Sequence, residues 1–282
     1  MKNVAIVGYG YVGKAMTNFF WEHYNTYIYD PIYSERSLQR NTKGYTTTFG
    51  ATRSEVNSCD VAIVCVPTPR DDSGKCDTAI VEETMHWLKC PLVVLKSTVE
   101  IGTTQNLIEK YGKNIVFSPE YAGESTYWSP YKFHTDVKET PFFIFGGDPS
   151  NTSKCVDLYM NVAGPTKQYI QTDPMSAETA KYMENSFYAT KITFCYEMNE
   201  ICKAAGVDYN KVRELWLLDP RINRMHTSVF SKNEFPFSGK CLPKDTSALV
   251  HLAKTKGYKA NLLDEVLKSN KRIGMVRKKR KN

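Results

Sequence analysis

The chain of 282 residues contains no apolar run long enough to cross a membrane. A membrane-spanning helix needs roughly 18 or more consecutive apolar residues, and polar or charged residues interrupt every apolar segment here before that length. The opening MKNVAIVGYG passes from a short apolar segment into glycines, without the apolar core or cleavage site of a signal peptide. We therefore expect a cytoplasmic protein with no membrane partner.

The eight cysteines include no C-x-x-C pair and no cysteine/histidine group at the spacing of a zinc site. We expect no metal site, and thiols rather than disulfides in a reducing cytoplasm. Most such thiols pack as small apolar groups. Cys241 differs, because it lies in FSGKCLPKDTSAL with Lys244 and Asp245 close by, in a stretch whose glycine and proline predict a loop.

The last twelve residues, KRIGMVRKKRKN, contain no acidic residue and seven basic ones. They account for the net charge of +7, since the rest of the chain has 30 basic and 30 acidic residues. A neutral body argues against a nucleic-acid partner. We expect residues 271–282 to form a basic tail, either mobile in solvent or in contact with a phosphate-rich partner.

Residues 1–150 alternate short apolar runs with helical stretches, and the chain length favours two domains. The alternation predicts an α/β fold, with a Rossmann-type doubly wound parallel sheet as an NAD-binding domain over residues 1–150. The expected strands are 4–7, 26–29, 61–66, 92–95, 115–117 and 142–145.

Residues 151–270 are predicted to form a helical central and catalytic domain with one long helix. The pair Asp173-Pro174 is typical of a helix start, and apolar residues then recur at helical spacing as far as Gly206. The methionine and phenylalanine stripe on this helix indicates core or a dimer interface. Shorter helices are expected at 213–218, 247–256 and 262–273, with an irregular stretch over 219–245.

The first strand leads into Gly8-Tyr-Gly10-Tyr-Val-Gly13 and then a helix. In this context the G-x-G-x-x-G pattern favours dinucleotide binding, because the glycines allow backbone to approach a pyrophosphate at a helix N-terminus. Asp30, at the end of the second strand, is placed to accept hydrogen bonds from a ribose. A carboxylate there disfavours a 2′-phosphate, so we expect NAD rather than NADP.

Two further groups of polar residues suggest chemistry, although either could be exposed polar residues without function. Lys181 and Asn185 share one face of the long helix, where an ammonium and an amide can stabilise an oxyanion. Glu120 and Glu124 follow the strand 115–117, and Thr98 follows the strand before it, at the edge that lines the cofactor crevice. A carboxylate there can act as a general base for water.

Together these segments resemble the nucleotide-sugar dehydrogenases, the UDP-glucose/GDP-mannose dehydrogenase family. VAIVGYGYVG, VCVPTP, KSTVEIGTT, SPEYAGES, AKYMENSFYATKITFCYEMNEIC and GKCLPKDTSAL resemble the family's motifs in the same order and over nearly the whole chain. The similarity is greatest to UDP-glucose 6-dehydrogenases. Members of the family normally carry a third, C-terminal nucleotide-binding domain, which this chain is expected to lack.

The resemblance implies a four-electron, NAD-dependent oxidation of the C6 alcohol of a nucleotide sugar, such as UDP-glucose to UDP-glucuronate. Cys241 would be the nucleophile, and Lys181 and Asn185 would stabilise oxyanions. Asp245 and Thr98 would position or deprotonate substrate and water, and Glu120 would act as base in hydrolysis with support from Glu124. Arg221 would reach the substrate of a partner subunit in a homodimer that pairs through the long helix.

The resemblance also implies two sets of binding residues. Those expected to bind the cofactor are Gly8, Gly10, Tyr11, Val12, Gly13, Asp30, Pro67, Thr68, Thr98, Glu124 and Lys244. Those expected to bind the substrate are Glu120, Tyr121, Glu124, Lys181, Asn185, Arg221 and Cys241.

Two alternatives remain open from the sequence. A two-electron dehydrogenase of the 3-hydroxyacid type would use the glycine turn with Lys181 and Asn185, and Cys241 would be incidental. A non-catalytic NAD-binding protein would need only the first domain. The loop before Cys241 also departs from the family pattern, because it has lost two glycines and places Lys240 beside the thiol.

Overall fold

The computed structural model describes residues 1–71, 74–122, 132–230, 235–239 and 241–279. The chain forms two compact units. The first comprises Met1–Thr68 and Asp77–Lys181, and the second comprises Pro69–Cys76 and Tyr182–Asn282. None of the helices in the described ranges is both long and apolar enough to span a bilayer.

The first unit is built on one mixed sheet, whose nine strands in the described ranges follow the order β3-β4-β2-β1-β5-β6-β7-β8-β9. The strands from β4 to β7 are parallel to one another; β3 runs antiparallel to β4, and β8 runs antiparallel to β7. β9 is parallel to β8. The strands are β1 (Asn3–Val7), β2 (Asn25–Tyr29), β3 (Ser37–Arg40), β4 (Thr46–Phe49), β5 (Val61–Val64), β6 (Leu92–Leu95), β7 (Ile115–Phe117), β8 (Phe142–Gly146) and β9 (Gln168–Thr172).

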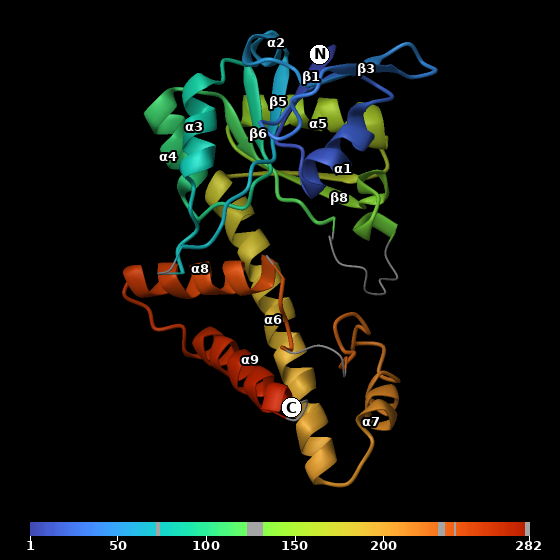
Figure 1. Cartoon of the computed structure of the whole chain (residues 1–282), viewed down its shortest axis with the longest axis vertical. Helices are drawn as coiled ribbons and strands as arrows, with labels where there is room; N and C mark the ends of the chain where they lie inside the picture. The colour runs from blue at the N-terminus through green and yellow to red at the C-terminus, as the bar shows by residue number, and fades with distance from the viewer. Residues whose placement is uncertain (72–73, 123–131, 231–234, 240, 280–282) are drawn as a thin grey trace. The chain divides into compact units, whose positions relative to one another are not determined.

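Helices cover both faces of this sheet, because the central strands are apolar on both sides (Figure 1). Val4 and Ile6 of β1 face α1 (Tyr11–Phe20) and α5 (Pro149–Ala163). The alternate residues of the central strands pack against α2 (Arg53–Asn57), α3 (Ala79–Trp87) and α4 (Thr103–Tyr111). Two short 3₁₀ turns, η1 (Lys132–His134) and η2 (Val137–Glu139), precede β8. The predicted doubly wound α/β fold is confirmed.

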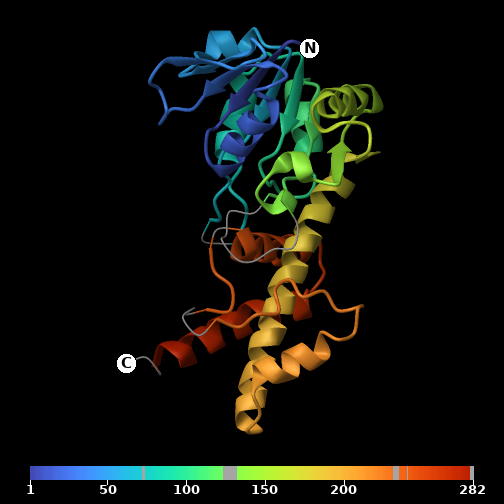
Figure 2. The same cartoon turned by 90° about the vertical axis from the view of Figure 1, so that its right-hand side faces the viewer.

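The long helix predicted after Asp173 is α6 (Pro174–Ala204), which is 31 residues long. Both views show it as one continuous helix (Figure 1 and Figure 2). The Asp173 carboxylate accepts a hydrogen bond from the Ser176 amide, which caps the helix start. Gly206, with φ of 69°, allows the chain to leave the helix soon after its end. The second unit adds α7 (Tyr209–Trp216), α8 (Cys241–Thr255) and α9 (Asn261–Lys279).

Two expectations from the sequence are corrected in the second unit. The stretch containing Cys241 was predicted to be a loop, whereas α8 begins at Cys241 itself. Pro243 in the first turn is compatible with this start, because amides there have no partner within the helix. The basic segment was expected to form a tail after a helix ending at 273, whereas α9 continues to Lys279.

The extension of α9 has a packing reason. Asn270 is nearly fully buried, and its side chain both accepts from the Phe237 amide (3.0 Å) and donates to the Phe237 carbonyl (3.1 Å). One turn later, a Cβ at Gly274 would lie 2.2 Å from the Phe235 ring, so only glycine allows this approach. This face of α9 therefore fixes the segment that leads to Cys241, while Lys271 and Arg272 remain exposed.

Candidate active site

The glycine turn forms a cradle that fits a dinucleotide. Gly8 has φ of 92° and a Cβ there would lie 2.7 Å from the Cys65 carbonyl oxygen, while a Cβ at Gly13 would lie 2.0 Å from the Gly8 oxygen. A Cβ at Gly10 would instead meet nothing within 4 Å, so the backbone there is open to a ligand. Gly10 also caps α1 without any side chain, which leaves the first amides of the helix available to phosphate oxygens.

Asp30 lies directly after β2 and is tied to this turn. One carboxylate oxygen accepts from the Tyr9 amide at 2.6 Å, and the other accepts from the Ile32 amide at 2.8 Å. Each oxygen keeps a further lone pair, so the carboxylate can also accept from ribose hydroxyls. Tyr11 and Val12, also expected to contact the cofactor, are the first two residues of α1.

The loops after β5 and β6 are joined at the same edge of the sheet. Pro67 is exposed and Thr68 is buried, and the Thr68 hydroxyl donates to the Thr98 carbonyl at 2.7 Å. Glu178, at the start of α6, accepts from the Gly102 amide at 2.5 Å and the Thr104 amide at 2.9 Å. Its burial raises the pKa of this carboxyl. The segment that carries Thr98 is thus anchored at both ends.

Glu120 forms a buried ion pair with a residue that the sequence reasoning did not single out. Its Oε2 lies 3.3 Å from the Lys96 ammonium, and the two side chains are 9% and 2% exposed. Oε1 accepts from the amides of Tyr121 and Ala122, both at 2.8 Å. A lysine at the end of the apolar run LVVLK was the available signal, because buried lysines nearly always have a partner.

Lys181 and Tyr121 also meet within the first unit. The Lys181 ammonium lies 4.7 Å from the centre of the Tyr121 ring, a cation–π contact. Tyr121 is held in turn by an edge-to-face contact with Phe142, with ring centres 5.0 Å apart. Two residues expected to contact substrate are thus brought together.

Asn185 and Asp245 form the polar centre of the second unit. The Asn185 amide nitrogen donates to Asp245 Oδ2 at 2.5 Å, and the Lys244 ammonium lies 2.6 Å from Asp245 Oδ1. Asp245 is only 1% exposed, so it depends on these two partners to offset its charge. Lys244, which was expected to contact the cofactor, forms an ion pair with this carboxylate.

Cys241 is the most accessible of the cysteines, all of which the structure describes and none of which is in a disulfide. It is exposed at the first residue of α8, and a helix N-terminus stabilises a thiolate. Burial instead raises the pKa of Cys59, Cys65, Cys90 and Cys155 to about 12. Those four are therefore poor nucleophiles at neutral pH.

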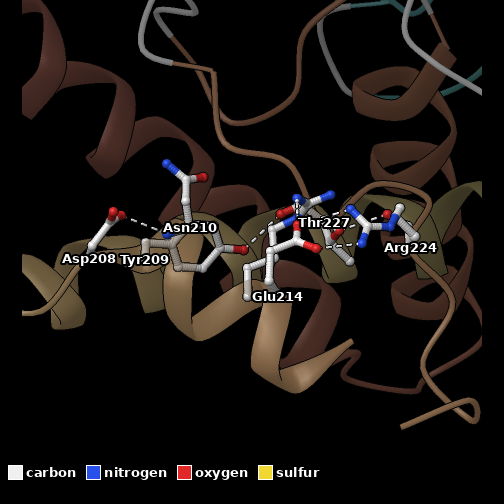
Figure 3. A network of polar contacts seen from close by, with 7 residues as sticks. Asp208, Tyr209, Asn210, Glu214, Arg224 and Thr227 are labelled. Atoms are coloured by element: carbon white, nitrogen blue, oxygen red, sulfur yellow. Dashed lines mark hydrogen bonds and ion pairs between the residues drawn. The ribbon is translucent and has the colours of Figure 1, made fainter. Parts of the chain in front are cut away.

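Arg221 lies in the loop after α7, which is braced by the polar network in Figure 3. Arg224 forms a two-pronged ion pair with Glu214 of α7, at 2.9 and 2.5 Å. Thr227 accepts from Tyr209 through its carbonyl and from Arg213 through its hydroxyl. The Arg221 guanidinium itself is paired with Asp219 and its side chain is 86% exposed.

Two expected residues lie outside the described part of the chain, Glu124 and Lys240. Among the residues that the structure does describe, no three histidine, cysteine or acidic side chains are grouped as metal ligands.

A largely parallel sheet with an open glycine turn, followed by a long helix, defines a Rossmann-type dehydrogenase fold. Residues 20–161 match the NAD binding domain of the UDP-glucose/GDP-mannose dehydrogenase family, and residues 175–272 match its central domain. The first of these matches spans about half of the chain, and the chain therefore belongs to this family. The predicted family and its cofactor, NAD, are confirmed.

Individual relatives give the same result. The UDP-glucose 6-dehydrogenase TuaD of Bacillus subtilis (strain 168) is 29% identical, over 96% of this chain and 63% of TuaD. The GDP-mannose 6-dehydrogenase of Azotobacter vinelandii is 29% identical, over 76% of this chain and 51% of the relative. This chain thus spans less than two thirds of either protein. The structure of a UDP-glucose dehydrogenase from Pyrobaculum islandicum superposes with a TM-score of 0.79 at 25% identity, covering 96% of this chain and 68% of that one.

The Asp30 carboxylate generates a prediction about cofactor choice. NAD should bind more tightly than NADP by about tenfold or more, because a 2′-phosphate would meet the carboxylate. Asp30→Asn should reduce this ratio, since it removes the charge and keeps an acceptor. The matched control is Asp60→Asn, because Asp60 also accepts backbone amides, from Lys2 and Asn3. If calorimetry gives equal affinities for NAD and NADP, Asp30 does not lie at the ribose.

Proposed function

We propose that this chain carries out the NAD-dependent, four-electron oxidation of the C6 alcohol of a nucleotide sugar, with UDP-glucose as substrate and UDP-glucuronate as product. Family membership supports the reaction class. The observation that carries the mechanism is Cys241, an exposed thiol at the start of α8. One turn later on that helix, Asp245 is held by Asn185. We place this reaction in the cytoplasm, where reducing conditions keep a catalytic thiol free.

The first oxidation gives an aldehyde. NAD, when bound at the glycine turn, supplies the hydride acceptor for both oxidations. Removal of hydride from the alcohol carbon requires loss of the hydroxyl proton, which we assign to Asp245, with Thr98 holding a water in the proton path. Lys181 and Asn185 stabilise the oxygen as negative charge develops on it.

Cys241 then converts the aldehyde into a second hydride donor. Its thiolate adds to the carbonyl carbon, a C–S bond forms, and the oxygen takes a proton to give a thiohemiacetal. Loss of the second hydride and of that proton leaves a thioester. Water attacks the thioester while Glu120 accepts a proton from the water, and the C–S bond breaks to release the thiolate and the carboxylic acid, which gives its proton to solvent.

The Cys241 thiol distinguishes the proposed four-electron oxidation from the two-electron alternative. A 3-hydroxyacid type of dehydrogenase needs only the hydride acceptor, Lys181 and Asn185, and its product leaves as a ketone or aldehyde. Nothing in that reaction requires an exposed cysteine at a helix N-terminus. The choice of UDP-glucose over GDP-mannose rests on the similarity to TuaD, which extends over 96% of this chain, against 76% for the GDP-mannose relative.

We also propose a homodimer that pairs through α6. Met183, Phe187, Phe194 and Ile201 fall on one face of this helix, and each is more than half exposed. An apolar stripe of this length on a helix surface is typical of a protein interface. In such a dimer, the exposed Arg221 would be available to the substrate of the partner.

The nucleophile assignment is tested by Cys241→Ser. Formation of the sugar acid should fall by about 10³-fold or more, because a serine hydroxyl is not ionised at neutral pH. NAD binding by calorimetry should be unchanged. Cys90→Ser is the matched control, since serine can keep the hydrogen bond that Cys90 donates to the Val56 carbonyl. If the Cys241 variant makes the acid at the wild-type rate, the nucleophile lies elsewhere.

The dimer is tested by placing charge on the stripe. The wild-type chain should be a dimer by light scattering at micromolar concentration, and Phe187→Asp combined with Phe194→Asp should give a monomer, because the interface would then bury unpaired carboxylates. Leu262→Asp, at an exposed position on α9, should leave the dimer intact. A monomeric wild-type chain contradicts the proposal.

A further inference from the structure

Lys96 and Glu120 meet because two parallel strands end at the same edge of the sheet. β6 and β7 are neighbours, with Leu95 in register with Phe117. Lys96 directly follows β6, and Ser118 directly follows β7. The lysine side chain can therefore reach across to the segment Ser118–Pro119–Glu120 that leaves β7.

The Lys96 ammonium contacts all three residues of this segment. It lies 3.4 Å from the Ser118 hydroxyl, 3.4 Å from the Pro119 carbonyl oxygen and 3.3 Å from Glu120 Oε2. It donates hydrogen bonds to the first two of these groups and forms an ion pair with the third. Burial of a lysine that is only 2% exposed is unfavourable unless such partners are present.

Tyr159 keeps the ammonium in this position. Lys96 Nζ lies 5.8 Å from the centre of the Tyr159 ring, and Tyr159 is fully buried. The ring is held by aromatic contacts on several sides. Its aromatic neighbours are Phe19, Phe20, Phe143 and Phe145, at centre distances of 5.0 to 5.5 Å. The Lys96 ammonium thus lies near an aromatic ring that is itself held in place.

The two oxygens of Glu120 are not equivalent. Oε1 is fixed by two backbone amides, whereas Oε2 is buried, faces the ammonium as an ion pair and accepts no hydrogen bond. Oε1 therefore anchors the carboxylate, and Oε2 keeps a lone pair for a further donor. A water molecule is a donor of the right size for such a position.

Activation of the nearby thiol of Cys65 is the competing role for this lysine. Burial raises the pKa of Cys65 to about 12, although the charge of Lys96 acts in the opposite direction. Cys65 therefore stays a neutral thiol at physiological pH. The Lys96 ammonium therefore stabilises the Glu120 carboxylate and does not activate the Cys65 thiol.

We propose that Lys96 is the positioning residue for the hydrolytic step, holding Glu120 so that Oε2 faces the water that attacks the thioester. This inference rests on the proposed function. In the step, water gives a proton to Oε2 as its oxygen bonds to the acyl carbon, and the thiolate leaves. Lys96 gives no proton to the reacting atoms.

The test separates acylation from hydrolysis by rapid-quench kinetics with UDP-glucose and NAD. Lys96→Met should keep the first burst of NADH, while steady-state turnover falls by about 10- to 100-fold, as expected when a base is misplaced. Intact-protein mass should then show an acyl group on Cys241, as it should for Glu120→Gln. Lys96→Arg should recover part of the turnover, since it retains the cation.

The matched control is Lys113→Met. Lys113 precedes β7 at its opposite end and donates to the Leu88 carbonyl, so its loss should leave both the burst and the turnover unchanged. Turnover of Lys96→Met equal to that of this control, with no adduct, overturns the proposal. Loss of the burst in a Lys96 variant that still binds NAD also overturns it, because the defect would then precede hydrolysis.

A wild-type chain that yields no NADH with any nucleotide sugar refutes the proposed function, and the role of Lys96 with it. If Lys96→Met does not fold, Lys96→Arg carries the test. A planar guanidinium cannot reproduce the contacts of the ammonium with Ser118, Pro119 and Glu120, so an adduct and slower turnover are expected. Wild-type kinetics in a folded Lys96→Arg variant overturn the proposal.

Discussion

The carboxylate of Asp245 is the constraint on which the chemistry of the second unit depends. A carboxylate that is 1% exposed must be compensated, and Asn185 of α6 and Lys244 of α8 do this together. The bond to Asn185 fixes α8 against α6 at one turn from Cys241. The N-terminus of α8, which carries the Cys241 thiol, is thereby fixed against α6. Asn270 of α9 binds the Phe237 backbone in the segment that precedes Cys241.

The first unit also compensates buried charged groups, at the carboxyl edge of its sheet. There Lys96, Glu120 and Glu178 are buried charged groups, and each is paired with a neighbouring loop or helix start. These contacts connect the segments after β6 and β7 in fixed positions. The expected catalytic groups Thr98 and Glu120 are therefore carried by a rigid scaffold, as a preorganised site requires.

Much of the fold could be predicted from the sequence, because its central strands are apolar on both faces and its glycine turn has a strict local requirement. β3, β4 and β9 were missed, since SLQR, TTTF and QYIQT lack an apolar run and owe their conformation to strand pairing. The start of α8 was missed because Gly239 and Pro243 flank Cys241 and favour a loop locally. The continuation of α9 past Ile273 includes a close contact of Gly274 with Phe235, which no periodicity reveals.

The sequence predicts how the site residues are arranged only where they are close to one another in sequence. Lys181 and Asn185 could be assigned to one helix by their spacing, but their partners Tyr121 and Asp245 lie 60 residues away in sequence. The run LVVLK marked Lys96 as a buried lysine that needs a partner, but only the register of β6 and β7 brings Glu120 to it.

In the proposed reaction, Cys241 turns a two-electron dehydrogenase fold into a four-electron enzyme. The most direct measurement is the number of NADH molecules formed for each molecule of UDP-glucose consumed, with the product identified by mass. The proposed reaction gives two NADH and one UDP-glucuronate for each UDP-glucose. A ratio of one, with an aldehyde released, would contradict it.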